Sequence, residues 1–309
     1  MSASVNLTPL CHLCDIPELD LEFLQHTAMT SETNFLQSVL ITGCSAGGIG
    51  SALAETFHER GLHVFATARS TSKMTHLEKL PNITLLELDV TDSKSVESAV
   101  EVVTAMTGGK LNYLINNSGQ SLVMPALDTN IEDAKKLFDV NLWGVVAVTQ
   151  AFSPLILTTK GTIVNVASLA AFFRSPWLSF YNASKAAVEA YTHTIRHELA
   201  PFGVKVVTVT AGIVQTNIFR PIEAIPLPPD SIYKAASKEM VGIANGKLIQ
   251  GAMAPAEFAK RVADDVLGGA TGVIWRGTTA TIGRIMYTIL PTWLLDRLTF
   301  PGSGLDKLN

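Results

Sequence analysis

From about residue 38 to residue 276 the chain alternates short apolar runs with longer stretches of helical periodicity. The runs are rich in Val, Ile and Leu and predict buried strands at 38–42, 63–69, 83–91, 111–115, 161–168, 203–210 and 272–276. The stretches between them predict helices at 51–60, 93–105, 131–157, 181–199 and 256–267. Strands that are apolar on both faces and alternate with helices are typical of a doubly wound parallel sheet. We therefore expect a single α/β domain with a Rossmann fold.

Two segments break this alternation. Between about residues 213 and 251 the pattern is interrupted by Pro221, Pro226, Pro228 and Pro229, and only a weak helix at 233–240 follows. A segment this long and irregular inside a compact domain is more often functional than disordered, so we expect a substrate lid at 213–251. We expect a disordered N-terminal extension at 1–34, a Rossmann domain at 35–277 and an apolar helical tail at 278–309.

The tail leaves two interpretations open. Apolar residues recur at helical spacing and are widened into a broad stripe: Ile282, Ile285, Met286, Ile289, Leu290, Trp293, Leu294 and Leu295. Arg284, Pro291, Asp296 and Arg297 make the segment too short and too polar to span a membrane. The tail either caps the substrate pocket or an oligomer interface, or rests as an amphipathic element on a membrane or lipid surface.

Composition excludes several classes of protein. The chain has 309 residues, 47% of them hydrophobic, with a net charge of -4, which gives no reason to expect a nucleic-acid partner. Three cysteines argue against a disulfide framework, and no second ligand pair follows Cys11 and Cys14 at zinc-finger distance, so we expect no metal site. The acidic residues before residue 34 and the absence of an apolar leader core indicate neither a secretory signal nor a mitochondrial presequence. We expect a cytoplasmic protein.

A glycine-rich turn follows the first predicted strand and opens the first helix. It runs Gly43-Cys-Ser-Ala-Gly-Gly-Ile-Gly50. Small residues let the backbone approach a pyrophosphate, and the helix N-terminus supplies N–H groups and a positive dipole end. Strand, turn and helix in this order predict a dinucleotide-phosphate cradle.

The ends of the next two strands indicate which dinucleotide binds. The second strand ends in Ala68-Arg69-Ser70, without the acid that would hold a ribose 2′-hydroxyl in an NAD-binding unit. Because arginine is permanently charged and forked, Arg69 suits a 2′-phosphate, so we expect NADP(H). Asp89, at the end of the third strand, is placed to meet the adenine edge.

Polar residues follow the later strands and suggest catalysis. Asn116 and Asn117 suit backbone bracing beside a cofactor, and Ser168 ends an apolar strand. Asn141 lies within a predicted helix, where asparagine is unfavourable, so we expect it to make a specific hydrogen bond. Tyr181 and Lys185 lie one turn apart on one helix face, where an ammonium would lower the pKa of the phenol towards the range useful for proton transfer. His193 and His197 have metal-ligand spacing but no third partner, and we interpret them as helix-surface residues.

Over residues 38–276 these motifs resemble the short-chain dehydrogenase/reductase family. Its TGxxxGxG loop resembles Thr42 to Gly50, one residue longer here, so that either Gly47 or Gly48 could take the middle position. Its NNAG motif resembles Asn116 to Gly119, and its PG after the sixth strand is Ala211-Gly212 here. The resemblance implies catalytic roles for Asn141, Ser168, Tyr181 and Lys185. It implies cofactor binding by Gly43, Ser45, Gly48, Ile49, Gly50, Arg69, Asp89, Asn117, Tyr181, Lys185, Ile213 and Thr216.

The resemblance also implies an activity. We expect hydride transfer between the nicotinamide and a carbonyl carbon of a hydrophobic substrate, with Tyr181 protonating the oxygen, Ser168 hydrogen-bonded to it and Asn141 positioning a water that relays protons to Lys185. Within the family, the loop and the tail resemble fungal NADPH-dependent 1-acyldihydroxyacetone-phosphate reductases and relatives that include ketoreductases of secondary metabolism. The choice between these two substrate classes remains open. A nucleotide-binding protein without catalytic activity is a further alternative. The resemblance to the reductase subgroup implies peripheral contact with endoplasmic reticulum or lipid droplets. The resemblance to the family implies a homodimer or homotetramer.

Overall fold

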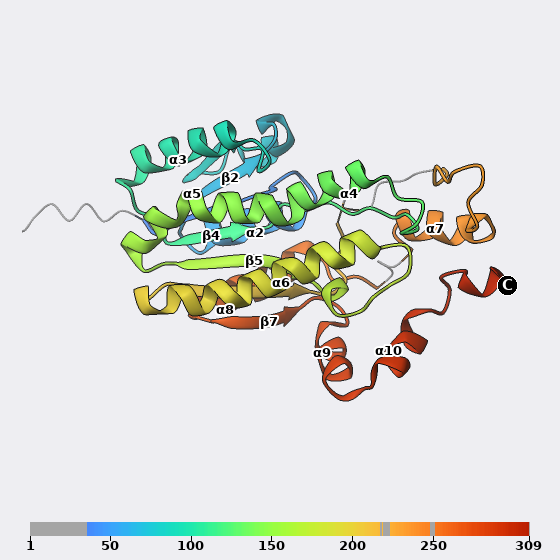
Figure 1. The fold of residues 1–309 in the computed structure, drawn as a ribbon. Helices are drawn as coiled ribbons and strands as arrows, with labels where there is room; N and C mark the ends of the chain where they lie inside the picture. Colours follow the sequence, from blue (N-terminus) through green and yellow to red (C-terminus); the bar gives the residue numbers. More distant parts are fainter. Residues whose placement is uncertain (1–35, 217, 219–222, 248–250, 309) are drawn as a thin grey trace, which may run out of the picture. The chain divides into compact units, whose positions relative to one another are not determined.

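A computed structural model describes residues 36–216, 218, 223–247 and 251–308. The expected extension at 1–34, with Cys11 and Cys14, lies outside the described residues. The core is a parallel seven-stranded sheet in the order β3-β2-β1-β4-β5-β6-β7, as the pattern of apolar runs predicted (Figure 1). The strands are β1 Ser38–Ile41, β2 His63–Ala68, β3 Ile83–Glu87, β4 Tyr113–Asn116, β5 Thr162–Ser168, β6 Lys205–Ala211 and β7 Gly272–Arg276.

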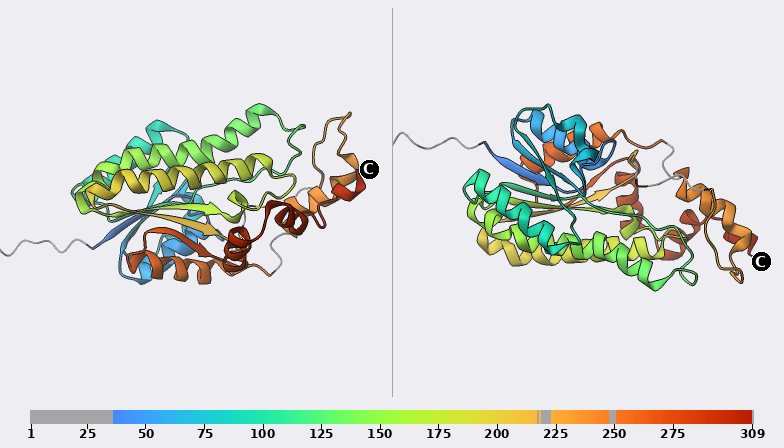
Figure 2. Two further views of the ribbon diagram at one scale, coloured as in Figure 1. Left: turned by 60° about the horizontal axis from the view of Figure 1, so that its bottom comes forward. Right: turned by 90° about the horizontal axis from the view of Figure 1, so that it is seen from above.

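Helices cover both faces of the sheet, because successive strand residues point to opposite sides. Val39 and Ile41 of β1 pack in a cluster with α2 Ile49–Glu59 and α8 Pro255–Leu267. Leu40, between them, packs in a second cluster with α3 Ser93–Thr107, α5 Gly144–Thr159 and α6 Ser179–Leu199. The two helical layers are visible on either side of the sheet in Figure 2. Both faces are buried, so the doubly wound α/β class is confirmed.

Some boundaries differ from the predicted ones. The helix predicted at 131–157 consists of α4 Ile131–Phe138, a π-helical turn at Asp139–Trp143 and α5. The third strand ends at Glu87, because Asp89 turns the chain: its carboxylate accepts hydrogen bonds from the N–H and the hydroxyl of Thr91 at 2.9 and 2.7 Å. The sixth strand continues through Ala211, where alanine, unlike the family's proline, can donate a ladder hydrogen bond.

The predicted lid contains a short 3-10 helix, Lys234–Ala236, and α7 Ser237–Ala244. Ala236, Met240 and Ile243 form a small apolar cluster with Ile225 and with Trp177, which lies just before α6. Residues 217, 219–222 and 248–250 of this segment lie outside the described residues. The lid is therefore packed against the loop that leads to Tyr181.

The tail forms α9 Ala280–Ile289, α10 Thr292–Thr299 and a 3-10 turn at Leu305–Lys307. Helix α9 contacts β7, whereas residues 300–308, here called the C-terminal strap, return to the lid (Figure 1). The indole Nε1 of Trp177 donates a hydrogen bond to the Ser303 carbonyl at 2.8 Å, and the Lys307 ammonium pairs with Glu239 of α7 at 2.6 Å. The tail thus connects the last strand of the sheet to the lid.

Candidate active site

The residues predicted to carry the chemistry meet at the carboxyl edge of the sheet. Gly43 follows β1, Asn117 follows β4, Ser168 ends β5 and Gly212 follows β6. In the register of the sheet Ser168 lies beside Ala211, and Asn116 lies beside Asn165. Open α/β sheets bind their ligands at this edge, so the location agrees with a catalytic site.

The glycine-rich turn has a backbone that only small residues allow. Gly47 has a φ of +74°, in the left-handed region, while Gly48 is extended and caps α2. A Cβ on Gly50 would lie 2.4 Å from the Gly43 carbonyl oxygen and 2.6 Å from Nδ2 of Asn117, so α2 packs directly on the start of the loop.

Asn117 and Thr42 hold this turn in place. The Asn117 amide donates hydrogen bonds to the carbonyls of Thr42 at 2.9 Å and of Gly43 at 3.3 Å. The Thr42 hydroxyl accepts the N–H groups of Asn117 and Ser118, both at 2.9 Å. Asn117 therefore braces backbone as expected, and the backbone that it braces is that of the glycine-rich turn. Sequence reasoning gave Thr42 no role, because its partners come from a strand more than seventy residues away.

These residues fit a dinucleotide phosphate. The first-turn N–H groups of α2, at Ile49 and Gly50, have no acceptor within the helix, and they follow an extended Gly48 without a side chain. Arg69 is exposed at the end of β2, and the N–H of Ala46 donates to the Lys73 carbonyl at 2.9 Å, which brings the segment after Arg69 against the loop that carries Ser45. Lys73 is a further cation at this corner, four residues after Arg69, that sequence reasoning missed.

The other expected cofactor residues are placed as follows. Asp89 is half-buried beyond β3. The N–H of Ile213 donates to the Thr278 carbonyl at 2.9 Å, and its carbonyl accepts the N–H groups of Met253 and Thr278 at 3.1 and 3.2 Å. Because these bonds use its backbone groups, Ile213 would contact a cofactor through its side chain. Thr216 is half-buried, and its hydroxyl accepts the N–H of Ile218 at 3.5 Å.

Tyr181, Ser168 and Lys185 form the centre of the site. Tyr181 and Lys185 lie in the first two turns of α6, and the phenol is hydrogen-bonded to Ser168. The Lys185 ammonium is buried and donates to the Val166 carbonyl of β5 at 3.0 Å. A Cβ on Gly119 would lie 3.4 Å from this ammonium nitrogen, which places the end of the Asn116–Gly119 motif against it.

The pKa values of this pair differ from the expectation. Burial raises the pKa of the Tyr181 phenol, and the hydrogen bond to Ser168 opposes that rise. Burial lowers the pKa of Lys185 to about 8. The i, i+4 spacing predicted a lowered pKa for Tyr181, whereas in the protein without cofactor the pKa is raised. Desolvation of the phenol outweighs the hydrogen bond from Ser168, which acts in the lowering direction. At neutral pH the phenol is protonated and can donate.

Asn141 is fully buried in the π-helical turn, where it makes the expected specific hydrogen bonds. Its Oδ1 accepts the Gln120 N–H at 2.8 Å, and its Nδ2 donates to the Gln120 carbonyl at 2.9 Å and to the Ser184 hydroxyl at 3.0 Å. Ser184 donates in turn to the Tyr181 carbonyl at 2.8 Å. Gln120 and Ser184 were missed by sequence reasoning; the available signal for Ser184 was its position between Tyr181 and Lys185.

Beyond Ser168 the site has an aromatic wall. Phe172 lies with its ring centroid 4.8 Å from the rings of both Trp275 and Tyr287. A Cβ on Gly283 of α9 would lie 2.9 Å from the Leu169 side chain and 3.2 Å from that of Phe173. The wall joins the segment after β5 to β7 and α9, so the approach to Ser168 is apolar on this side.

A dinucleotide cradle and a Ser–Tyr–Lys set at one sheet edge define the class of nicotinamide-dependent oxidoreductases. The family model described as short chain dehydrogenase matches residues 37–225, and the chain belongs to this family of oxidoreductases.

Individual relatives agree with this assignment. The chain is 45% identical over 270 residues to the short-chain dehydrogenase ptmH of Penicillium ochrochloron, covering 87% of this chain and 99% of that protein. It is 41% identical over 262 residues to the NADPH-dependent 1-acyldihydroxyacetone phosphate reductase of Schizosaccharomyces pombe, covering 80% and 88%. A crystal structure of a short chain dehydrogenase from Burkholderia cenocepacia in complex with NADP is 26% identical, covers 86% of this chain and 98% of that one, and superposes with a TM-score of 0.68.

Proposed function

We propose that the protein reduces a ketone to a secondary alcohol on a hydrophobic substrate, with NADPH as the reductant. The observation that carries this proposal is the hydrogen-bonded pair of Ser168 and Tyr181 at the sheet edge, beside the aromatic wall at Phe172. Two hydroxyls that reach one point can bind a single carbonyl oxygen, and apolar surroundings suit a hydrophobic chain.

The cofactor is NADP(H). The cradle between β1 and α2 would hold the pyrophosphate, and Arg69, with Lys73 nearby, would hold the 2′-phosphate. When bound, the nicotinamide supplies or accepts the hydride at the substrate carbon. Relatives and structural neighbours named for NADPH or NADP support this choice over NAD(H).

The side chains of this protein handle the proton and the charge. Tyr181 donates its proton to the carbonyl oxygen, since its raised pKa keeps the phenol protonated at neutral pH. Ser168 donates a hydrogen bond to the same oxygen and stabilises the charge that develops there. The Lys185 ammonium, protonated at neutral pH, stabilises the Tyr181 phenolate left after transfer. Asn141 fixes the start of α6 through Ser184 and thereby orients Tyr181.

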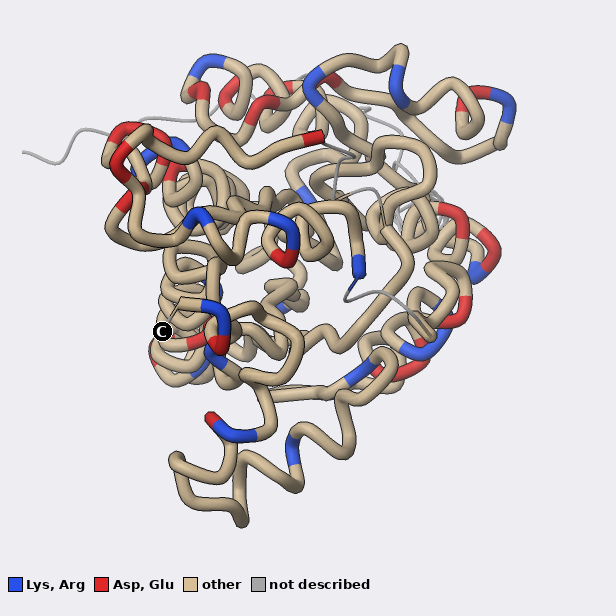
Figure 3. Tube along the Cα trace, turned by 90° about the vertical axis from the view of Figure 1, so that its right-hand side faces the viewer, with Lys and Arg blue, Asp and Glu red and all other residues tan. Residues whose placement is uncertain are grey.

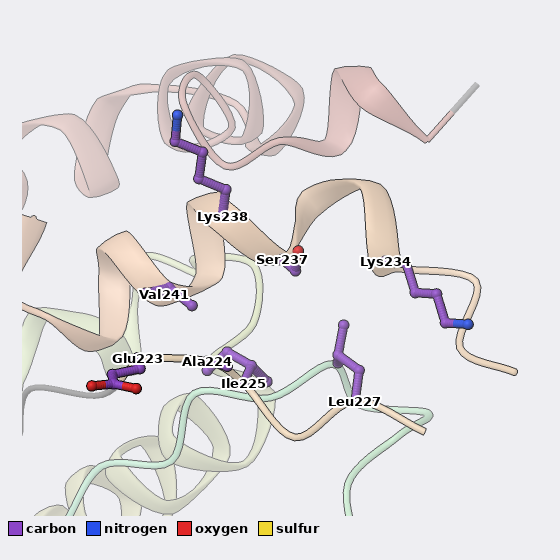
Figure 4. Close-up of a pocket in the computed structure, with 8 residues that line it drawn as sticks. All are labelled: Glu223, Ala224, Ile225, Leu227, Lys234, Ser237, Lys238 and Val241. Atoms are coloured by element: carbon purple, nitrogen blue, oxygen red, sulfur yellow. The ribbon is translucent and has the colours of Figure 1, made fainter. Parts of the chain in front are cut away.

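Two substrate groups compete. The relative named as a 1-acyldihydroxyacetone phosphate reductase supports a phosphorylated lipid precursor. Such a substrate needs cations for its phosphate, and a pocket of about 460 Å³ in the lid is lined by Lys234 and Lys238 together with Glu223. In Figure 4 these three charged side chains point in different directions. The Lys234 ammonium is also hydrogen-bonded to the Pro229 carbonyl, and Arg220 lies outside the described residues.

This arrangement favours a phosphate-free ketone, such as an intermediate of fungal secondary metabolism. The test is NADPH oxidation by the purified protein with 1-acyldihydroxyacetone phosphate and with a panel of hydrophobic ketones, with NADH as control. We expect turnover of hydrophobic ketones and a clear preference for NADPH. Turnover restricted to the phosphate ester would instead establish the lipid precursor as substrate. Tight NADPH binding without turnover of any carbonyl compound would refute the reductase proposal.

We also propose a homodimer or homotetramer that pairs α5 and α6 across an interface. Trp143, at the end of the π-helical turn, and Leu157 of α5 are large apolar side chains that are exposed to solvent. Their exposure supports an interface along this helix. Sedimentation velocity of the protein and of Trp143→Asp tests it, and a wild-type monomer at every concentration would exclude it. For its location we propose the cytoplasm, with contact to endoplasmic reticulum or lipid droplets, to be tested by cell fractionation.

A further inference from the structure

Exposed apolar side chains are concentrated in the tail. Of the sixteen large apolar side chains that are exposed in the described part of the chain, seven lie between residues 280 and 300: Ile282, Ile285, Tyr287, Ile289, Trp293, Leu298 and Phe300. Isolated apolar residues on a surface are ordinary, but a concentrated group indicates an interaction site. We call this group the tail face.

The tail face differs from the side of α9 that packs on the protein. Ala280 and Gly283 are buried, and the Tyr287 ring packs against that of Phe172 although Tyr287 is 41% exposed. Ile282, Ile285 and Ile289 recur at intervals of three and four residues, so they form one stripe, rotated away from Ala280 and Gly283. Ile289 is 72% exposed. The exposed stripe therefore does not cap the substrate pocket. The oligomer interface, which belonged to the same interpretation of the sequence, is one outcome of the test below.

The chemistry of the tail face matches a phospholipid surface. Trp293, 66% exposed, and Tyr287 are the residue types enriched at membrane–water interfaces. Arg284 of α9 and Arg297 of α10 are exposed, and Asp296 is the only acid between residues 278 and 300. The segment at the bottom of Figure 3 accordingly carries few charged residues. Exposed apolar side chains and two exposed arginines on the same pair of helices complement the acyl chains and the anionic headgroups of a lipid surface.

The tail face does not cross a membrane. The described helix that is long and apolar enough to do so runs from Ile131 to Thr159, and Val148 and Phe152 of its second half are fully buried against the sheet. We interpret that helix as part of the core. Helix α9, with ten residues, and α10, with eight, are far shorter than a span.

We propose that the tail face docks on a phospholipid surface that contains anionic headgroups, with α9 and α10 lying in the plane of the surface. This inference deepens the proposed function, because it rests on a hydrophobic substrate. Helix α9 also lies against Leu169, which directly follows Ser168, and against Phe173, five residues after Ser168. Docking thus brings the apolar approach to the catalytic serine next to the lipid, from which such a substrate can enter.

Flotation with lipid vesicles tests the docking. The full-length protein is mixed with vesicles of phosphatidylcholine alone or with a fifth of phosphatidylserine, and bound protein is separated on a density gradient. We expect binding that is tighter on the anionic vesicles. We expect Ile285→Asp/Ile289→Asp to reduce the affinity by roughly tenfold or more, since two apolar side chains can no longer be buried. The matched control is Phe202→Asp, because Phe202 is 60% exposed just before β6, at the opposite edge of the sheet.

Fluorescence locates the contact. Vesicles with brominated acyl chains quench a tryptophan that enters the apolar layer, and Trp293 is the tryptophan in the tail face. We expect quenching that Trp293→Phe removes and that Trp143→Phe leaves unchanged. NADPH binding by each variant shows that it is folded, and turnover of a water-soluble ketone measures the reductase activity separately from docking.

Three outcomes would overturn the proposal. The first is wild-type protein that stays in solution with both kinds of vesicle. The second is equal binding by Ile285→Asp/Ile289→Asp and wild type. The third is a lipid-independent dimer that the same double substitution dissociates, which would assign the tail face to a second copy of the chain. Each can occur with full ketone turnover, so a failed docking proposal is distinguishable from a failed reductase proposal.

Discussion

At the scale of single residues, the site buries a cation that the fold alone would exclude. Lys185 is 5% exposed, and its ammonium has the Val166 carbonyl, not a carboxylate, as the hydrogen-bond partner described here. Burial lowers its pKa from 10.5 to about 8, which means that the native state disfavours the charged form. A position that costs stability and supports the chemistry is typical of functional sites.

Replacing Lys185 by methionine should therefore stabilise the protein and abolish turnover. Because the native pKa is about 8 and the unfolded one 10.5, the unfolded state of the wild type binds more protons between these pH values. The contribution of Lys185 to wild-type stability should therefore rise by up to about 3 kcal/mol over this window. Lys185→Met lacks that rise and should be more stable than wild type at pH 7. Urea unfolding of wild type and Lys185→Met at pH 7 and pH 10 measures their free energies of unfolding. If Lys185→Met is more stable than wild type by the same amount at both pH values, burial of the Lys185 charge is not the cause.

Removing the phenolic hydroxyl separates proton donation from cofactor binding. Tyr181→Phe keeps the ring but cannot protonate the carbonyl oxygen, so we expect kcat to fall by at least about a thousandfold. The affinity for NADPH should stay within a few-fold of wild type, since the pyrophosphate cradle is untouched. Stopped-flow turnover and fluorescence titration with NADPH measure the two effects. Full turnover by this variant would contradict the assigned role.

At the scale of elements, two irregular pieces of backbone position the site: the glycine loop before α2 and the π-helical turn before α5. The π-helical turn places Asn141 between Gln120 and Ser184, which lie far apart in the sequence. π-helical turns are rare and frequent at functional sites. Both pieces are stabilised by hydrogen bonds to other elements more than by their own local pattern.

The glycine loop predicts a contrast between two substitutions. In Gly50→Ala the new methyl would lie 2.4 Å from the Gly43 carbonyl oxygen, so α2 and the loop must separate. We expect about 2 kcal/mol of lost stability and at least a hundredfold weaker NADPH binding. In Gly48→Ala the methyl meets only the Ser45 carbonyl oxygen within 4 Å, at 3.2 Å, and stability should change by less than about 1 kcal/mol. Thermal unfolding and NADPH titration compare them; equal stabilities would refute the close contact.

The sequence predicted what short-range patterns encode and missed what distant partners decide. Strand positions followed from apolar runs such as that of β5, and the strand–glycine–helix order located the cradle. Asn141 was predicted to make a specific hydrogen bond, but its partners Gln120 and Ser184 could not be read from periodicity. The π-helical turn escaped because apolar spacing is the same on both sides of it. The sequence did not predict which side of α9 faces solvent, because the other side packs on Phe172 and Phe173, more than a hundred residues earlier in the chain.

At the scale of the whole molecule, the strap connects the last strand to the substrate side. Leu305 and Leu308 pack against the lid cluster of Trp177 and Met240, and the Ser303 carbonyl accepts the indole N–H of Trp177. Trp177 is itself in the left-handed region, with a φ of +69°, four residues before Tyr181. The strap therefore supports the loop that leads into α6, the helix that carries Tyr181 and Lys185.

Removal of the strap should affect the substrate more than the cofactor. In a chain that ends at Thr299 the lid and Trp177 lose apolar contacts and a buried hydrogen bond. We expect KM for a hydrophobic ketone to rise by about tenfold or more, with NADPH affinity unchanged. Lys307→Ala is the control, because it removes the ion pair between Lys307, which is 47% exposed, and Glu239, which is 15% exposed, and leaves the apolar contacts of the strap and the Trp177 hydrogen bond in place. Steady-state kinetics measure both variants; an unchanged KM after truncation would exclude a role for the strap in substrate binding.

The strap also fixes when the protein becomes competent during its own synthesis. All seven strands have left the ribosome once Arg276 has emerged, so the sheet and its nucleotide cradle can form while the tail is still being translated. The outer support of the lid waits for residues 303–308. A nascent or prematurely terminated chain can therefore capture the nucleotide before it can select its substrate.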